Sequence, residues 1–201
     1  MRKRGCNPSL VSYNAIVHGL CTEGGCMRTY QLFKEVPMQA YVVTLNTVIK
    51  GLCQMGKVED ALKVLGDMTS GKFCSPDAVT FTIIITGGLS IGRIDDGLDL
   101  LHNTMLERGF SPGIVTYNTV LRELFELQKA NEAMKVIRSM VDDGVIADSI
   151  TNTIITGGLF ESGQIDEAKK FWENIIWPSN LHDNYVYAVI VKRVLPCRPL
   201  E

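Results

Sequence analysis

The amino-acid sequence predicts an all-α fold, a solenoid of stacked helix-turn-helix repeats. A similar segment opens six times along the 201 residues, at Leu10, Val42, Ala78, Ile114, Ser149 and Asn184, so that successive openings lie 32, 36, 36, 35 and 35 residues apart. A period of that length is typical of helical-hairpin solenoids. Within a repeat, apolar residues recur at the spacing of one helix face, as in Leu45, Val48, Ile49, Leu52 and Cys53.

The period divides the chain into five whole repeats and two partial ones. Repeat 1 is short, and the later repeats are longer: 10–41, 42–77, 78–113, 114–148 and 149–183. Residues 1–9 resemble the end of a repeat, and residues 184–201 hold a partial repeat and a tail. We therefore expect the chain to begin and end inside a longer array.

The first half of each repeat is rich in Val, Thr and Ile, a composition that alone favours a strand. The apolar spacing favours a helix instead, and so does the glycine that follows, because glycine suits the left-handed residue that ends many helices. This glycine recurs at Gly24, Gly56, Gly92 and Gly163. Repeat 4 has Gln128 there, so we expect a less regular turn.

The second half of each repeat predicts another helix. Acidic residues near its start, such as Glu59 and Asp60, suit the positive end of the helix dipole. One turn later a small residue recurs, which lets two helices of a hairpin approach closely: Thr29, Ala61, Gly97, Ala133 and Ala168. Bulky apolar pairs follow and should fill the core.

Composition excludes several functional classes. Apolar residues make up 46% of the chain, but no apolar run reaches the roughly 18 residues of a membrane span. The net charge of −2 argues against nucleic-acid binding through bulk basic charge, but it allows a local groove. Cys21 and Cys53 occupy equivalent places and should be buried, reduced thiols. We find no catalytic, phosphate-binding or metal signature, and so expect neither a cofactor nor an enzyme.

The segments VTLNTVIKGLCQMGKVEDALKVL and VTYNTVLRELF resemble the pentatricopeptide repeat, the 35-residue helical hairpin of plant organelle RNA-binding proteins. The resemblance extends from about Arg4 to Val194. It implies a right-handed superhelix that binds single-stranded RNA with one base per repeat. It also implies a mitochondrial or plastid location.

The resemblance further implies which residues contact the bases. The fifth and last residues of a repeat read the base, which gives the pairs Asn14 with Tyr41, Asn46 with Asp77, Thr82 with Gly113, Asn118 with Asp148, and Thr153 with Asp183. The second residue sandwiches the base: Val11, Val43, Val79, Val115 and Ile150. The Asn and Asp pairs of repeats 2 and 4 imply uracil.

The register of repeat 5 has two readings. Counted back from Gly163 the reader is Thr153, which implies guanine, whereas counted forward from the opening motif it is Asn152, which implies uracil. The preserved helix length favours Thr153.

Each of these residues also has an ordinary structural interpretation. The asparagines could lie on a solvent face, the valines could be hairpin packing, and Asp77, Asp148 and Asp183 could be helix N-caps. A protein-binding scaffold like the tetratricopeptide repeat is the alternative function, although the Trp, Gly, Tyr and Pro pattern of that repeat is absent. Truncated ends would expose apolar faces, so we also expect self-association.

Overall fold

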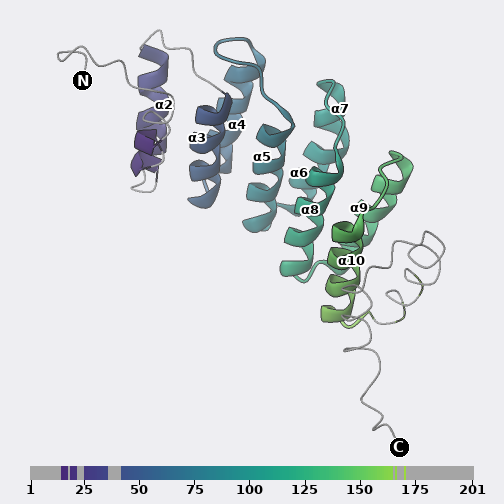
Figure 1. Cartoon of the computed structure of the whole chain (residues 1–201). Coiled ribbons are helices and arrows are strands. Elements are labelled where there is room, and N and C mark those ends of the chain that lie inside the picture. Colours follow the sequence, from purple (N-terminus) through teal and green to yellow (C-terminus); the bar gives the residue numbers. More distant parts are fainter. Residues whose placement is uncertain are drawn as a thin grey trace, which may run out of the picture. The chain divides into compact units, whose positions relative to one another are not determined.

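The computed structural model describes residues 15–17, 19–21, 25–35, 42–164, 166 and 170, and within them the fold is all-α, as predicted (Figure 1). The helices are α2 Cys26–Glu35, α3 Val42–Gln54, α4 Val58–Thr69, α5 Ala78–Ser90, α6 Ile94–Asp99, α7 Met105–Glu107, α8 Ile114–Glu126, α9 Ala130–Asp142 and α10 Ser149–Glu161. A π-helical turn, η2 Leu100–Thr104, joins α6 to α7. None of the described helices is long and apolar enough to cross a membrane.

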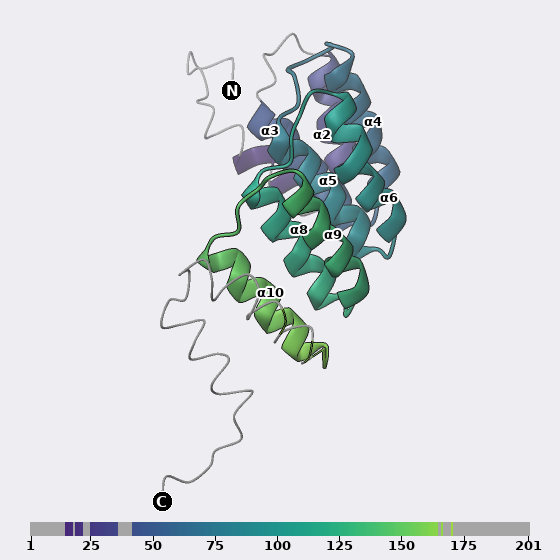
Figure 2. The same cartoon turned by 90° about the vertical axis from the view of Figure 1, so that its right-hand side faces the viewer.

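The chain forms two compact units, Met1–Ser111 and Pro112–Glu201, and each is described by itself. In the first unit α3 packs against α2, α4 and α5, and α5 packs against α6. In the second unit α8 packs against both α9 and α10, and Figure 2 shows α8 beside α9. Helices α3, α5, α8 and α10 each span 13 residues, so that repeats 2 to 5 have first helices of the same length.

Each hairpin buries the apolar faces that its periodicity predicts. In α3 the side chains of Leu45, Val48, Ile49 and Leu52 are completely buried, and Ala61 of α4 is buried with them. The small residue of the second helix is needed for this approach. At Gly97 of α6 an added Cβ would lie 3.0 Å from Leu89 Cδ2 of α5.

The turn after the first helix has the same backbone in repeats 2, 3 and 5, which have glycine there, and in repeat 4, which has glutamine. Gly56, Gly92 and Gly163 have φ of 71°, 84° and 74°, and Gln128 has φ of 58°. Lys129 N donates to Leu124 O at 2.8 Å, just as Lys57 N donates to Leu52 O at 2.9 Å. The expected irregular turn at Gln128 is therefore wrong, because tertiary packing imposes the left-handed conformation at a cost of about 1–2 kcal/mol.

Within each unit, α5 and α10 meet the preceding first helix at a glycine that the sequence analysis did not single out. It is the tenth residue of the first helix, and it faces a side chain from the last turn of the preceding first helix. A Cβ at Gly87 of α5 would lie 2.4 Å from Cys53 Sγ of α3, and one at Gly158 of α10 would lie 2.2 Å from Phe125 Cγ of α8. Both approaches are too close for any residue with a Cβ. They also account for the predicted burial of Cys53.

Polar side chains link the same repeats at their turns. Arg93 forms an ion pair with Glu59, and Gln164 Nε2 donates to Asn131 Oδ1 at 3.1 Å. Arg93 and Glu59 are substantially exposed, so their pair adds little stability. The tight contact at glycine is what fixes the stacking.

We predict that Gly158→Ala lowers the free energy of unfolding by about 1–3 kcal/mol, because the new methyl group overlaps the Phe125 ring. The adjacent Gly157→Ala is the matched control, since nothing lies within 4 Å of its added Cβ. This control variant should instead raise the urea concentration at the midpoint of unfolding slightly, because alanine favours a helix by about 1 kcal/mol over glycine. Urea unfolding followed by circular dichroism measures both. A larger loss of stability for Gly157→Ala than for Gly158→Ala would mean that Gly157, and not Gly158, faces Phe125.

Candidate functional site

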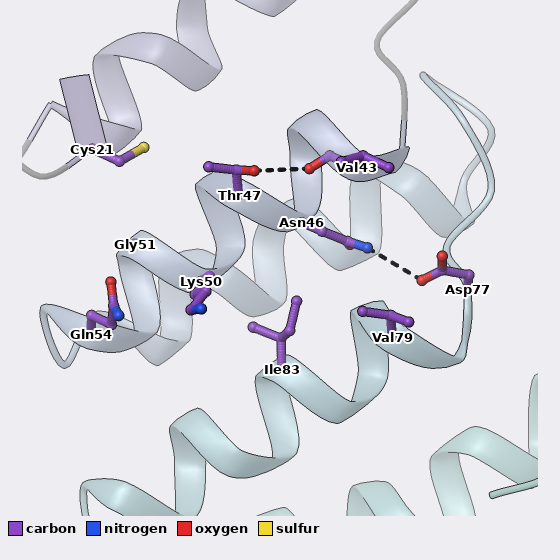
Figure 3. A pocket seen from close by; sticks show the side chains of 10 residues that line it. All are labelled: Cys21, Val43, Asn46, Thr47, Lys50, Gly51, Gln54, Asp77, Val79 and Ile83. Atoms are coloured by element: carbon purple, nitrogen blue, oxygen red, sulfur yellow. Dashed lines mark hydrogen bonds between the residues drawn. The ribbon is translucent and has the colours of Figure 1, made fainter. Parts of the chain in front are cut away.

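Asn46 and Asp77 come together in the first unit at the α3–α5 contact. Asn46 is the fifth residue of α3, and Asp77 is the N-cap of α5. Asn46 Nδ2 donates to Asp77 Oδ1 at 3.3 Å, as Figure 3 shows. Asn46 is only 8% exposed. The structure thus joins two residues that lie 31 positions apart and that the sequence analysis paired.

Local helix chemistry holds Asp77 in this place. The Asp77 carboxylate accepts a hydrogen bond from Thr80 N at 2.8 Å, and Asp77 N donates to Thr80 Oγ1 at 3.1 Å. This reciprocal arrangement is a capping box. Burial raises the pKa of the Asp77 carboxyl, but hydrogen bonds from Thr80 and Asn46 outweigh it and lower the pKa below its usual value. Asp77 is therefore an anion at neutral pH.

Two valines lie on either side of this pair. Val43 and Val79 are each the second residue of a first helix, and they are 55% and 56% exposed although they are apolar. They line one pocket of about 390 Å³ with Asn46 and Asp77 (Figure 3). That volume lies within the usual range for small-ligand sites. The pocket has apolar sides and a polar end, which suits a flat ring with a polar edge.

The second unit carries an equivalent set of residues. Asp148 is the N-cap of α10 and accepts from Thr151 N at 2.7 Å. Hydrogen bonds from Thr151 lower the pKa of the Asp148 carboxyl, and a hydrogen bond from Asn118 lowers it by a smaller amount. Val115 and Ile150 are largely exposed. One difference stands out: the buried Asn118 Oδ1 has no hydrogen-bond partner in the structure.

For the other predicted base-reading residues the structure shows only local contacts, or does not describe the residue. Thr82 Oγ1 and Thr153 Oγ1 each donate to the carbonyl four residues earlier, at 2.8 Å. Gly113 is the N-cap of α8 and provides no side-chain cap. The remaining predicted site residues lie outside the described part of the chain: Asn14, Tyr41, Asp183 and Val11.

The structure distinguishes Asn152 from Thr153 by position. Counted from Ser149, Thr153 is the fifth residue of α10, as Asn46 is of α3. Asn152 is completely buried, at the place that Phe81 and Tyr117 occupy in their helices. Thr153 therefore lies at the helix position that Asn46 has in α3, and Asn152 belongs to the hairpin core.

Sequence reasoning missed several residues of the pocket. Lys50 and Gln54 of α3 and Ile83 of α5 line it in addition to the predicted ones. Lys50 and Gln54 follow Asn46 at intervals of four, so that all three share a helix face. This periodicity was available in the sequence and could have identified them.

The described residues contain no group of three or more His, Cys, Asp or Glu that could hold a metal ion. Cys21, which lines the pocket, and Cys53 are poor nucleophiles. Burial, with a smaller contribution from Cys26, raises the pKa of Cys21 to about 12, and burial raises the pKa of Cys53 to about 11. The described residues of the pocket can therefore hold a ligand through its shape and through hydrogen bonds.

Comparison with known families identifies the repeat. The model of the PPR repeat family matches residues 41–90, 76–126 and 112–161, and a second model, the PPR repeat, matches residues 4–36. The first model alone therefore covers more than half of the chain.

Two curated proteins of Arabidopsis thaliana are similar over short stretches. Pentatricopeptide repeat-containing protein At3g18020 is 60% identical over 35 residues, which are 17% of this chain and 5% of that protein. Pentatricopeptide repeat-containing protein At2g17670 is 30% identical over 67 residues, which are 33% of this chain and 14% of that protein. The chain thus matches only a small part of either relative.

Solved structures show the same fold. The pentatricopeptide repeat protein PPR10 in complex with an 18-nt psaJ RNA element has a TM-score of 0.73 at 21% identity, over 96% of this chain and 27% of PPR10. The PPR domain of Arabidopsis thaliana protein-only RNase P 1, in complex with tRNA, has a TM-score of 0.63 at 15% identity, over 92% of this chain and 96% of that domain. With the family matches and the repeated hairpins, they establish that this chain belongs to the pentatricopeptide repeat family.

Proposed function

We propose that the chain binds single-stranded RNA sequence-selectively, with one base per repeat. The observation that carries this proposal is the pocket in which the hydrogen-bonded Asn46 and Asp77 lie between two exposed valines. An exposed valine on each side leaves room for a flat base, and the polar pair lies at its edge. Single-stranded RNA is read by contacts of this kind to unstacked bases.

The relatives support RNA rather than a protein partner. PPR10 was solved with an RNA element and the RNase P domain with tRNA. The proposed role is to hold a strand during organelle RNA processing, stabilisation, splicing or translation.

The chemistry of Asn46 fits uracil in repeat 2. Its side-chain amide has two N–H donors and two acceptor lone pairs, of which one N–H is directed to Asp77. The remaining donor and acceptor can pair with a carbonyl and the ring N–H of uracil. Asn118 with Asp148 gives the same proposal for repeat 4.

The other repeats read less strictly under the same proposal. Thr82 with Gly113 and Asn14 with Tyr41 are unusual pairs, so their repeats should tolerate several bases. Thr153 with Asp183 corresponds to guanine.

We predict that RNA with uracil at the second and fourth of five consecutive base positions binds most tightly. Replacing either uracil by adenine or guanine should weaken binding about tenfold, or about 1.4 kcal/mol, because Asn46 or Asn118 then loses its base partner. Fluorescence anisotropy with short labelled oligonucleotides at one fixed salt concentration measures this effect. Equal affinity for all four bases would refute base reading. Failure to bind any single strand would favour the protein-binding scaffold.

We also predict that Val79→Ser weakens binding several-fold for every RNA sequence, because the valine contacts the face of a base and not its edge. Val141→Ser is the matched control, since Val141 is 59% exposed on α9 and is not part of the pocket. Neither exposed side chain contributes much to folding. The same anisotropy assay should show a loss for the first variant alone, and equal losses would contradict a sandwiching role.

A further inference from the structure

We propose that the Lys50 ammonium binds a phosphate of the RNA strand in repeat 2, next to the base that Asn46 contacts. Lys50 then contributes affinity that is the same for every base. This inference rests on the proposed function and adds a residue outside the predicted base-reading and base-sandwiching residues.

Lys50 lies on the same face of α3 as the base-reading residue Asn46. It lines the pocket together with Asn46 and Gln54, and the three residues follow one another at intervals of four (Figure 3). Four residues of an α-helix advance by about 6 Å, so the Lys50 backbone lies one turn further along α3 than Asn46. Lys50 is exposed to solvent, whereas Asn46 is buried.

The pocket carries one charge of each sign, and only the negative charge is engaged within the chain. Among the described residues that line it, Lys50 is the only cation and Asp77 the only anion. The Asp77 carboxylate accepts hydrogen bonds from Thr80 N and from Asn46 Nδ2. No ion pair joins Lys50 to an acidic residue in the described part of the chain. The Lys50 ammonium is therefore available to an anionic group of a ligand.

A phosphate is the anionic group that a base in this pocket brings with it, because each nucleotide of RNA carries one. A base with its faces against Val43 and Val79 and its edge at Asn46 leaves its sugar and phosphate towards solvent, where the exposed Lys50 can reach them. A lysine ammonium has three donors on a flexible stem, so it can bind a phosphate oxygen without a fixed geometry. Such a contact positions the strand and does not distinguish bases.

The residue at the position of Lys50 differs among the first helices. Lys50 is the ninth residue of α3, and the ninth residues of α5, α8 and α10 are Thr86, Arg122 and Gly157. A cation thus occupies this position in repeats 2 and 4, the repeats that pair Asn with Asp. In α8, however, Glu126 stands at the place that Gln54 has in α3, and its negative charge opposes a phosphate. Repeat 2 is therefore the better phosphate site of the two.

The test compares Lys50→Gln with Lys57→Gln in the anisotropy assay. Both variants lose one positive charge in the first unit, but Lys57 is an exposed residue before α4 that makes no side-chain cap and does not line the pocket. One phosphate contact to a single strand contributes about −0.7 to the slope of log K against log salt concentration, or roughly fivefold in affinity for each tenfold change in salt. We expect Lys50→Gln to lose about fivefold in affinity at about 0.1 M salt for every RNA sequence and to flatten the slope by about 0.7, and Lys57→Gln to do neither. Lys50→Arg keeps the charge and should retain binding.

A second measurement identifies the phosphate itself. One phosphate of the RNA is replaced by an uncharged methylphosphonate, and the replacement is moved along the strand one linkage at a time. A replacement next to the base of repeat 2 should weaken binding to the wild-type chain and have little further effect on Lys50→Gln, because the two changes remove the same contact. Equal effects on both chains at every linkage overturn the role of Lys50.

The outcomes separate this inference from the proposed function. A wild-type chain that binds no single-stranded RNA overturns the proposed function and the role of Lys50 together. A wild-type chain that prefers uracil, but loses equal affinity in Lys50→Gln and Lys57→Gln, overturns the role of Lys50 alone. The same holds if Lys50→Gln weakens binding to one base at repeat 2 and not to the others, because Lys50 would then contact a base edge.

Discussion

Each unit depends on how closely its neighbouring first helices approach, and a glycine sets that distance: Gly87 between α3 and α5, and Gly158 between α8 and α10. At one end of the α3–α5 contact, Cys53 lies against the backbone of Gly87. At the other end, Asn46 meets Asp77. A larger residue at position 87 would separate the helices and draw the polar pair apart. Packing between repeats therefore sets the geometry of the site.

The aspartate at the repeat boundary serves both the fold and the site. Asp77 caps α5 through Thr80 and also accepts from Asn46. The two interpretations left open by the sequence, N-cap and reader partner, are thus compatible, because a carboxylate has several acceptor sites. Capping also keeps the carboxylate in one place, which is what a partner for a buried amide needs.

The sequence predicted the helices well and the site in part. Periodicity identified the buried faces, and the resemblance paired Asn46 with Asp77, which the structure joins at 3.3 Å. The sequence analysis missed Gly87, Gly158 and Thr80, because these residues act through contacts with a neighbouring repeat, which the sequence of one repeat alone does not reveal. It also misjudged Gln128, because backbone preference is a weak guide where tertiary packing decides. The register of repeat 5 remained open in the sequence because paired glycines occur in both α5 and α10, and either glycine of α10 could be aligned with Gly87. In the structure Gly158 makes the close contact with the preceding first helix that Gly87 makes, and Gly157 makes none.

Repeats 2 and 4 differ in whether the buried side-chain oxygen of their asparagine has a hydrogen-bond donor. A buried carbonyl oxygen without a donor costs about 1–3 kcal/mol. Thr80 offsets that cost for Asn46 in the free protein, whereas Asn118 Oδ1 stays unpartnered. A donor from a bound ligand would gain more at Asn118, because it removes a cost that is already present. At Asn46 such a donor would gain less, because Thr80 already donates to that oxygen. The same Asn and Asp pair can therefore gain different amounts from a bound donor, according to where a neighbouring threonine places its proton.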